Sequence, residues 1–550
     1  LDGQYGSIDG LTIELPTGNY GQLELGRATK YEGSNTKYHT FKGGYDDRKE
    51  TTEYTTAEKL KTTLEDTNTY HGNLMYIRSL NNITLKAATG ANVNIAGVSM
   101  ESAHVHGTGD KTVHDYVLNN DIVDTNKSFW LVHHVNGIKF EGLNFTGNVN
   151  IASSLADALI DGVTFDNCSF TTNGTASDKG QAIRYYNENN NGKVSNLVVD
   201  NCKFYNCRHG VYTSHIKNIF VTNSEFDTTG HNAIAIQDFN GACDHGKVII
   251  TGNTFKNIGD RIIRFNNVGA GTQITITHNT VIGELIKKEV IKAESLANGV
   301  TCNIHSNSWG DGATFGTGFT EETGEPCAEI NGVKYISLAK ALAAAQDGDT
   351  VKLTQDITPD ERIVVTGNKN ITIDLAEKKI TSTADVAIVN DGNGKLTITG
   401  NGTVDTSSST NDENIAIWAR TGSIDIENGT FINKSNKEAT VYVGTSENAN
   451  EPVITIKGGT FKNSAEGTYT YNSSLKPLTL NVQNGKPVTS IVITGGTFYG
   501  NDPKNGDDNK GGTFLAPDYK SVETSAGSGV WTVSKMTWNE YPEDASVVPS

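Results

Sequence analysis

The chain has 550 residues, and its 45 Lys and Arg against 63 Asp and Glu give a formal net charge of -18 at pH 7. This length favours two or more domains over one compact core, and the acidic balance argues against binding to duplex nucleic acid. No stretch approaches the roughly 18 consecutive apolar residues of a membrane span, so we expect none in this chain.

The first predicted elements are short strands. Residues 9–15 alternate apolar and polar side chains, which is typical of a half-buried strand, and residues 82–85 repeat this pattern. Between them lies a polar, charged insert at residues 27–73, in which a capping box at Thr55–Glu58 predicts a short helix. Long inserts in solenoids usually lie on one face and often form binding surfaces.

A repeated turn motif governs the next part of the chain. A short apolar strand is followed by an Asn-containing turn and then by a large apolar residue, and these closing residues are Phe145, Phe170, Phe204, Phe226, Phe255, Val281 and Trp309. The spacing is about 27 residues, which fits one coil of a β solenoid. We therefore expect a first solenoid over residues 1–309, with the five Phe residues of this set in one interior stack.

A second series of turns follows. Residues 310–329 lack periodicity and are interpreted as a linker. Residues 337–346 form an amphipathic pattern that predicts a helix with Ser337 as its N-cap, suited to covering the open end of a second solenoid. Turns that close on Val404, Phe431, Phe461 and Phe498 place this solenoid at residues 330–531. Residues 532–550 are interpreted as a tail or as a linker to further domains of a larger surface protein.

The Gly-Asp-Thr-Val opening at residues 348–351, the Asn-Ile-Thr-Ile strand at 370–373 and the Gly-Gly-Thr-Phe turns resemble segments of the right-handed parallel β-helix superfamily, the pectate-lyase-like fold. The resemblance implies an all-β protein of two tandem right-handed parallel β-helix solenoids, the second with an N-terminal capping helix. The segment 328–351 is similar to segments of modular cell-surface proteins of Gram-positive gut bacteria. That resemblance implies an extracellular or cell-surface location.

Strands of the first solenoid can be aligned on an inward column that contains Ile183, Val211, Ile234, Ile263 and Ile291. Period-two alternation then places Arg184, Tyr212, Ala235, Arg264 and Lys292 on the outer face. A second outward column contains Tyr186, Ser214, Gln237, Asn266 and Glu294. Cations, amides and aromatic rings are the groups with which proteins bind sugars.

The leading hypothesis is therefore a secreted or cell-surface, adhesin-like protein that binds an extracellular glycan or glycoprotein without strong catalytic equipment. The predicted glycan-binding residues are Arg184, Tyr186, His209, Tyr212, His215, His231, Gln237, Arg261, Arg264, Asn266 and Lys292. A solvated sheet face with ordinary salt bridges is the alternative for any one of them. A structural stalk is a further alternative, and it suits the second solenoid, which has no His.

A polysaccharide lyase or glycoside hydrolase is the remaining alternative. Arg264 as a base with Asp238 or Asp260 nearby supplies the catalytic candidates. A hydrolase needs two carboxylates about 5–10 Å apart, whereas Asp238 and Asp260 lie at opposite ends of their strands, near 20 Å apart at about 3.3 Å per residue. We therefore expect no turnover of common plant or mucin polysaccharides.

No cofactor is predicted. His104 and His106 would lie on one face of a strand, but a metal site there lacks an identified third ligand. Cys168 and Cys202 occupy the same position of successive repeats, which is compatible with a disulfide or with two buried thiols.

Overall fold

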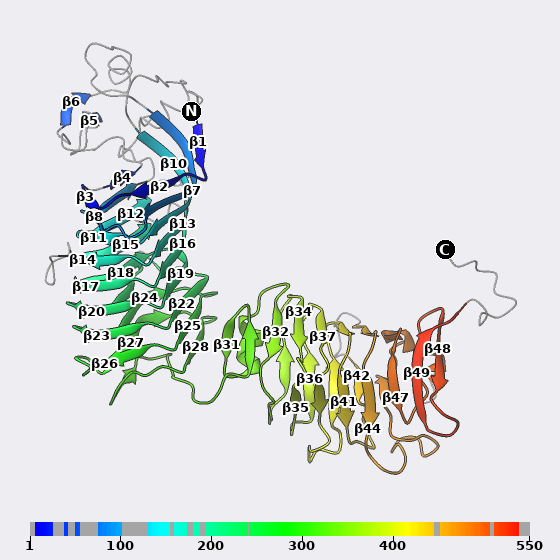
Figure 1. Cartoon of the computed structure of the whole chain (residues 1–550). Coiled ribbons are helices and arrows are strands. Elements are labelled where there is room, and N and C mark those ends of the chain that lie inside the picture. The colour runs from blue at the N-terminus through cyan, green and yellow to red at the C-terminus, as the bar shows by residue number, and fades with distance from the viewer. Residues whose placement is uncertain are drawn as a thin grey trace. The chain divides into compact units, whose positions relative to one another are not determined.

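The computed structural model describes residues 6–21, 23–25, 38–41, 50–54, 75–101, 130–153, 159–172, 180–187, 193–239, 241–444, 452–506 and 511–537. The chain divides into two compact units, Leu1–Thr323 and Gly324–Ser550. Each unit is a stack of short parallel strands connected by turns (Figure 1). The predicted all-β solenoid architecture is confirmed. In the described part of the chain, no helix is long and apolar enough to cross a membrane.

The first unit contains three large sheets, here named A, B and C. Sheet A consists, in pairing order, of β1 (Gly6–Asp9), β7 (Met75–Ala87), β10 (Trp130–Glu141), β13 (Leu159–Asp166), β16 (Lys193–Asp200), β19 (Lys217–Thr222), β22 (Lys247–Thr251), β25 (Gln273–Thr277) and β28 (Thr301–His305), and β2 (Thr12–Leu15) also pairs with β7. Sheet B consists of β26 (Thr280–Ile282), β23 (Thr254–Ile258), β20 (Glu225–Thr229), β17 (Lys203–Cys207), β14 (Ser169–Thr171), β11 (Asn144–Phe145), β8 (Val93–Ile95) and β3 (Gly18–Tyr20). Sheet C consists of β29 (Thr314–Phe315), β27 (Glu289–Leu296), β24 (Ile263–Val268), β21 (Ile234–Ile236), β18 (His209–Ser214), β15 (Gln181–Asn187), β12 (Val149–Ser153), β9 (Val98–Glu101) and β4 (Leu23–Leu25).

Successive strands of the chain visit sheets A, B and C in turn, so one coil of the solenoid uses one strand of each. In the insert, β5 (Tyr38–Phe41) and β6 (Glu50–Tyr54) form an antiparallel pair. The helix predicted after Thr55 lies outside the described residues.

Aromatic residues of sheet B fill the interior of the first unit. The rings of Phe145, Phe170, Phe204, Phe226 and Phe255 stack one on the next, with successive centroids 5.0, 4.7, 4.5 and 5.3 Å apart. All five side chains are buried. The predicted interior stack is confirmed, because strand pairing in register brings the same repeat position of each coil to the same place.

The turn between sheets A and B holds a second ladder, which is polar. Asn279 accepts a hydrogen bond from the backbone N–H of Asn253, and Asn307 accepts one from Asn279, at 3.0 and 2.9 Å between the heavy atoms. Earlier coils place Cys168 and Cys202 at this position, where both are buried free thiols rather than a disulfide. Hydrogen bonding to Cys168, followed by burial, raises the pKa of Cys202 well above its ordinary value.

Residues 310–323, interpreted from the sequence as part of a linker, pack as the last portion of the first unit. Strand β29 pairs with β27, and the buried ring of Phe319 lies 5.7 Å from that of Phe265. Glu321 accepts a hydrogen bond of 2.9 Å from the indole N–H of Trp309. The sequence does not predict that this segment packs on the first unit, because it occurs once at the end of the stack and has no repeat.

The second unit also has three sheets, here named D, E and F. Sheet D consists of β31 (Val333–Tyr335), β30 (Ala328–Ile330), β32 (Thr350–Leu353), β34 (Ile371–Asp374), β37 (Leu396–Thr399), β40 (Ile424–Ile426), β43 (Ile454–Ile456) and β46 (Ile491–Ile493). Sheet E consists of β35 (Lys379–Thr381), β38 (Thr403–Asp405), β41 (Thr430–Asn433), β44 (Thr460–Asn463), β47 (Gly496–Tyr499), β49 (Val530–Lys535) and β48 (Tyr519–Glu523). Sheet F consists of β33 (Ile363–Val365), β36 (Val386–Asn390), β39 (Ile415–Ala419), β42 (Val441–Val443) and β45 (Leu480–Val482). Two short 3-10 helices, η1 (Val488–Ser490) and η2 (Pro503–Asn505), lie in its connections.

Helix α3 (Leu338–Ala344) begins where the sequence predicts. The hydroxyl of Ser337 accepts a hydrogen bond of 3.2 Å from the backbone N–H of Lys340, which is the interaction of an N-cap. Leu338, Ala341 and Leu342 form its buried face, which packs against the first strands of this unit. The predicted helix and its N-cap are confirmed.

Candidate functional site

Sheet C carries the predicted binding face, and its register agrees with the sequence alignment. Arg184 pairs with Tyr212, Tyr212 with Ala235, Ala235 with Arg264, and Arg264 with Lys292. Parallel pairing without a register shift places these side chains in one column across neighbouring coils. The column is partly exposed except for Ala235, which is fully buried.

Several residues predicted for this face are buried instead. Their exposed fractions are 8% for Tyr186, 3% for His209, 5% for His215, 8% for Gln237 and 0% for Asp238. His209, His215 and Asp238 have the inward parity of Val211 and Ile234, so their burial agrees with alternation, whereas Tyr186 and Gln237 are buried in the outward column. The corrected face therefore contains Arg184, Tyr212, His231, Arg261, Arg264, Asn266 and Lys292.

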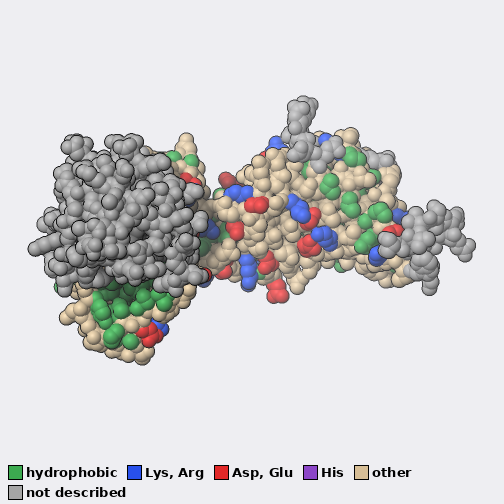
Figure 2. Space-filling view, turned by 90° about the horizontal axis from the view of Figure 1, so that it is seen from above, with side chains coloured by type: hydrophobic (Ala, Val, Ile, Leu, Met, Phe, Trp, Pro, Cys, Tyr) green, Lys and Arg blue, Asp and Glu red, His purple; other side chains and the backbone are tan. Residues whose placement is uncertain are grey.

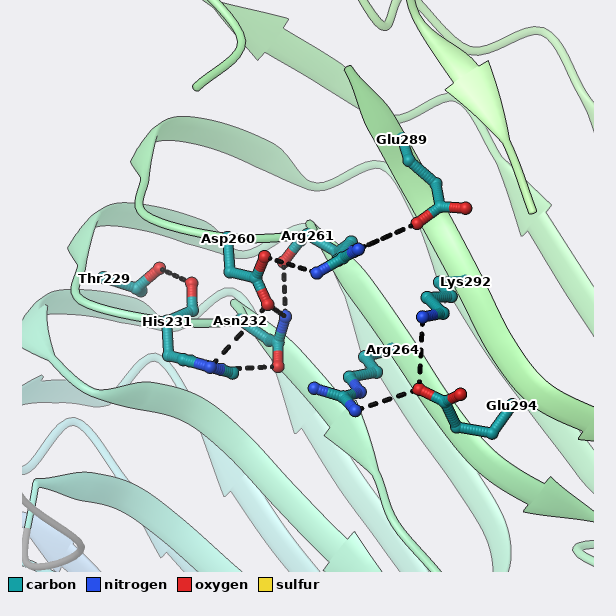
Figure 3. Close-up of polar contacts among 9 residues, drawn as sticks. All are labelled: Thr229, His231, Asn232, Asp260, Arg261, Arg264, Glu289, Lys292 and Glu294. Atoms are coloured by element: carbon teal, nitrogen blue, oxygen red, sulfur yellow. Dashed lines mark hydrogen bonds and ion pairs between the residues drawn. The ribbon is translucent and has the colours of Figure 1, made fainter. Parts of the chain in front are cut away.

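Carboxylates pair with most cations of the face, as Figure 3 shows. Glu294 accepts from Arg264 at 3.0 Å and lies 3.3 Å from the ammonium of Lys292. Arg261 bridges two carboxylates, with distances of 2.7 Å to Asp260 and 3.0 Å to Glu289. These pairs align the cations, and because they are partly exposed, each contributes little to stability.

Arg184 differs from the other cations of the face. Its guanidinium carbon lies 4.0 Å from the centroid of the Tyr186 ring, a cation–π contact. It forms no ion pair with any carboxylate of the described residues, and its Nε atom is buried without a hydrogen-bond partner among them. The guanidinium of Arg184 thus stacks on the buried Tyr186 ring, and its positive charge is available to a ligand.

Two histidines, His209 and His231, lie together at the edge of the face. The ring of His209 lies 5.0 Å from that of His231 and 5.6 Å from that of Tyr212. Burial, followed by the nearby His231 and Arg208, lowers the pKa of His209 to about 3. His209 is therefore uncharged at neutral pH. His231 lies 3.7 Å from Asp260.

Each of the catalytic candidates has a different set of partners, and no hydrogen bond or ion pair joins them to one another within the described residues. Asp260 pairs with Arg261 and accepts from Asn232 at 3.2 Å, whereas the buried Asp238 accepts from the backbone N–H of His215 at 2.6 Å. Arg264 pairs with Glu294. The hydrogen bond from Lys292 is the main reason that the pKa of Glu294 is lowered, whereas a general acid needs a raised pKa.

Two groups of residues escape prediction from the sequence. Asp238, Cys243 and His245 each place one ligand atom within 4.8 Å of the others. The Cys-Asp-His run at residues 243–245 is the available signal, but it lies outside the aligned strands, and the sequence prediction counts Asp238 with the edge of the outer face. The other group lies on sheet F, where the Trp418 ring has the guanidinium carbons of Arg362 and Arg420 at 5.6 Å and the Tyr442 ring at 6.2 Å.

His104 and His106, the metal candidates from the sequence, lie outside the described residues. Comparisons with protein-family models, with curated proteins and with solved structures found no match for this chain.

Proposed function

We propose that this protein is an extracellular or cell-surface, adhesin-like protein that binds an anionic glycan on the outer face of sheet C. Arg184 carries the proposal: it is held on the Tyr186 ring and has no carboxylate partner among the described residues. A cation fixed beside an aromatic residue, Tyr212, is able to bind a sugar carboxylate or sulfate by charge-assisted hydrogen bonds.

The neighbouring coils extend this surface. Arg264 and Lys292 share one carboxylate, Glu294, so two cations are matched by one anion at that point. Repetition of the column on adjacent strands, about 4.8 Å apart, offers several contacts along an extended chain. A polymeric glycan gains affinity from such repeated weak contacts.

Binding without cleavage is the form of the proposal that the geometry favours. Asp260, Glu289 and Glu294 each pair with a basic side chain, and Glu294 is held in its ionised form. A lyase or hydrolase acting on this face remains the alternative that the same experiment tests.

The second unit suits a supporting role. On its surface seen in Figure 2, acidic and basic side chains are interspersed and do not gather by sign. Lys457, for example, lies 3.3 Å from Asp425 and 2.7 Å from Glu427. The Trp418 cluster on sheet F gives this unit an aromatic surface that could contact a sugar ring.

A glycan array with the whole chain, followed by calorimetric titration of the best ligand, tests the proposal. We expect Arg184→Ala and Arg264→Ala each to weaken binding by about 1.5–3 kcal/mol, which is roughly tenfold or more. Binding should also weaken with added salt. Lys457→Ala is the matched control, because it removes a paired cation from the second unit.

Unchanged affinity in both arginine variants would contradict the proposed face, and loss of binding in Trp418→Ala instead would move the site to the second unit. The same glycans are assayed for reducing or unsaturated ends. Products that disappear in Arg264→Ala or Asp238→Ala would favour the enzyme alternative.

A further inference from the structure

A buried cluster of three potential metal ligands lies beyond the end of β21. Asp238 follows this strand, Cys243 forms an isolated parallel bridge with Val268, and His245 precedes β22. One ligand atom of each residue lies within 4.8 Å of the others. Asp238 and His245 have exposed fractions of 0%, and Cys243 is partly buried.

Two buried polar atoms of this cluster are close together but unpaired. Asp238 Oδ2 lies 2.8 Å from His245 Nε2. Despite this distance, neither atom has a hydrogen-bond partner among the described residues, because the contact lacks hydrogen-bond geometry. Buried polar atoms are nearly always satisfied, so two atoms side by side without hydrogen bonds favour a third group that binds both.

The surrounding contacts prepare His245 as a ligand. Its Nδ1 donates to the backbone carbonyl of Ile216 at 2.7 Å, which leaves Nε2 with a lone pair in the neutral ring. Its backbone N–H donates to the hydroxyl of Thr272 at 2.9 Å. A histidine that binds a metal is typically oriented by such a hydrogen bond from its other nitrogen.

Hydrogen bonds also fix the position of Asp238. Its Oδ1 accepts from the backbone N–H of His215 at 2.6 Å, so Oδ2 is directed to the cluster. Its backbone carbonyl accepts from Asn267 at 2.7 Å and from Asn266 at 3.3 Å. Contacts from two other coils thus fix a carboxylate oxygen beside a histidine nitrogen.

Two simpler interpretations fit the geometry less well. In a buried Asp–His ion pair, Nε2 would donate a hydrogen bond to Oδ2, but the 2.8 Å contact between these atoms is not a hydrogen bond. In a Cys–His–Asp catalytic triad, the two ring nitrogens are divided between the nucleophile and the carboxylate. Here Nδ1 donates to the Ile216 carbonyl, and Nε2 lies 2.8 Å from Oδ2 of Asp238, so neither nitrogen is left for a cysteine nucleophile.

We infer that Asp238, Cys243 and His245 bind a divalent transition-metal ion of the zinc type, with water as the remaining ligand. Nitrogen, oxygen and sulfur donors together select such an ion over Ca²⁺ or Mg²⁺, which prefer oxygen ligands alone. Ligand bonds of about 2.0–2.3 Å require the 2.8 Å contact to open by roughly half an ångström for tetrahedral coordination. On binding, the thiol of Cys243 gives its proton to solvent and its sulfur forms the bond to the metal.

Zinc content and affinity of the whole chain test the inference. The protein is stripped with a chelator under reducing conditions, exposed to Zn²⁺ and dialysed, and its zinc is measured by mass spectrometry. We expect Cys243→Ser, a nearly isosteric change, to lose one zinc per chain relative to the unsubstituted protein, with affinity lowered at least tenfold. Loading with Co²⁺ should give a sulfur-to-metal charge-transfer band that is absent from Cys243→Ser.

Cys302→Ser is the matched control, because Cys302 is another partly buried free cysteine of the same unit. It should keep both the zinc and the cobalt band, and excess Ca²⁺ or Mg²⁺ should displace neither. Equal zinc content and equal affinity in the unsubstituted protein and in Cys243→Ser would overturn the inference. So would a cobalt complex without a sulfur band. His245→Gln gives a second variant in which Cys243 is intact and the metal should still be lost.

Discussion

Single residues at the turns between sheets A and B determine how each coil bends. Asn167, Asn201 and Asn223 adopt φ values of 51°, 51° and 49°, in the left-handed region. Asn tolerates this region better than other non-glycine residues, and the next coil uses Gly252 at the same place, with φ 69°. The repeated Asn of the sequence motif is therefore a conformational requirement of the turn.

Asn201 offers a direct measurement of that requirement. Asn201→Ala should lower the free energy of unfolding of the first unit by about 1 kcal/mol, because alanine is strained at positive φ. Asn201→Gly should stay within about 0.5 kcal/mol of the unsubstituted protein. Denaturant titration of both variants gives the values. Equal losses in the two variants would mean that the side-chain amide matters more than the backbone angle.

His209 makes the first unit sensitive to acid. Its folded-state pKa is about 3, below the unfolded value of 6.5, so the unfolded chain binds the proton more readily. The resulting stability is present above about pH 6.5 and is lost as the pH falls toward about 3. His209→Gln should flatten this dependence by on the order of 1–4 kcal/mol, as followed by thermal unfolding between pH 7 and pH 4. The same slope in both proteins would show that His209 is protonated in the folded state.

At the scale of elements, the aromatic stack of sheet B is the main packing device of the first unit. Phe204 lies between two rings, with centroid distances of 4.7 Å to Phe170 and 4.5 Å to Phe226. Removing it would leave a cavity that the neighbouring coils are too constrained to fill. Sheet E of the second unit repeats the device with Phe431, Phe461 and Phe498.

Phe204→Ala should therefore destabilise the first unit by about 3–5 kcal/mol. The next residue provides the control: Tyr205 is 55% exposed, and Tyr205→Ala should change stability by no more than about 0.5 kcal/mol. Chemical unfolding followed by circular dichroism measures both. A loss of less than about 1 kcal/mol in Phe204→Ala would show that the coils can close over the gap.

The elements also show where sequence reasoning succeeds and where it ends. Strand register, the Phe stack and the N-cap at Ser337 are predictable, because each follows from a local pattern that repeats or from one side chain and its nearest backbone. The burial of Tyr186 and Gln237, which alternation directs outward, is not predictable, because it depends on how residues distant in the sequence pack against these positions. Alternation continued past Gln237 gives Asp238 the inward direction, but it cannot show that Cys243 and His245, which lie outside the aligned strands, meet Asp238 there.

At the scale of the whole molecule, the two units have separate cores and should respond to pH in opposite directions. Burial, followed by the charge of Glu413, raises the pKa of Glu438 in the second unit to about 7, above its ordinary value of 4.5. Stability from this group is present below about pH 4.5 and is lost as the pH rises through about 7. Through these two groups, acidification therefore raises the free energy of unfolding of the second unit and lowers that of the first.

Calorimetry of the whole chain should resolve this contrast as two unfolding transitions that shift differently between pH 8 and pH 5. Glu438→Gln should raise the stability of one transition by about 1 kcal/mol at pH 8, after allowance for solvent screening, and leave the other unchanged. His209→Gln should affect the remaining transition. A single transition that responds to both substitutions would instead show that the two units unfold together.

The antiparallel strands at the two ends of the second unit have a consequence for growth. A stack of parallel coils presents the same unpaired edge at each end, and such an edge can template another coil from another molecule. Here β30 runs antiparallel to β32 at one end, and β49 runs antiparallel to β47 at the other. Each reversal replaces the repeating edge with one that no further coil of this kind can match. Sheets D and E are thus self-terminating at these ends, which disfavours end-to-end pairing of two copies into filaments.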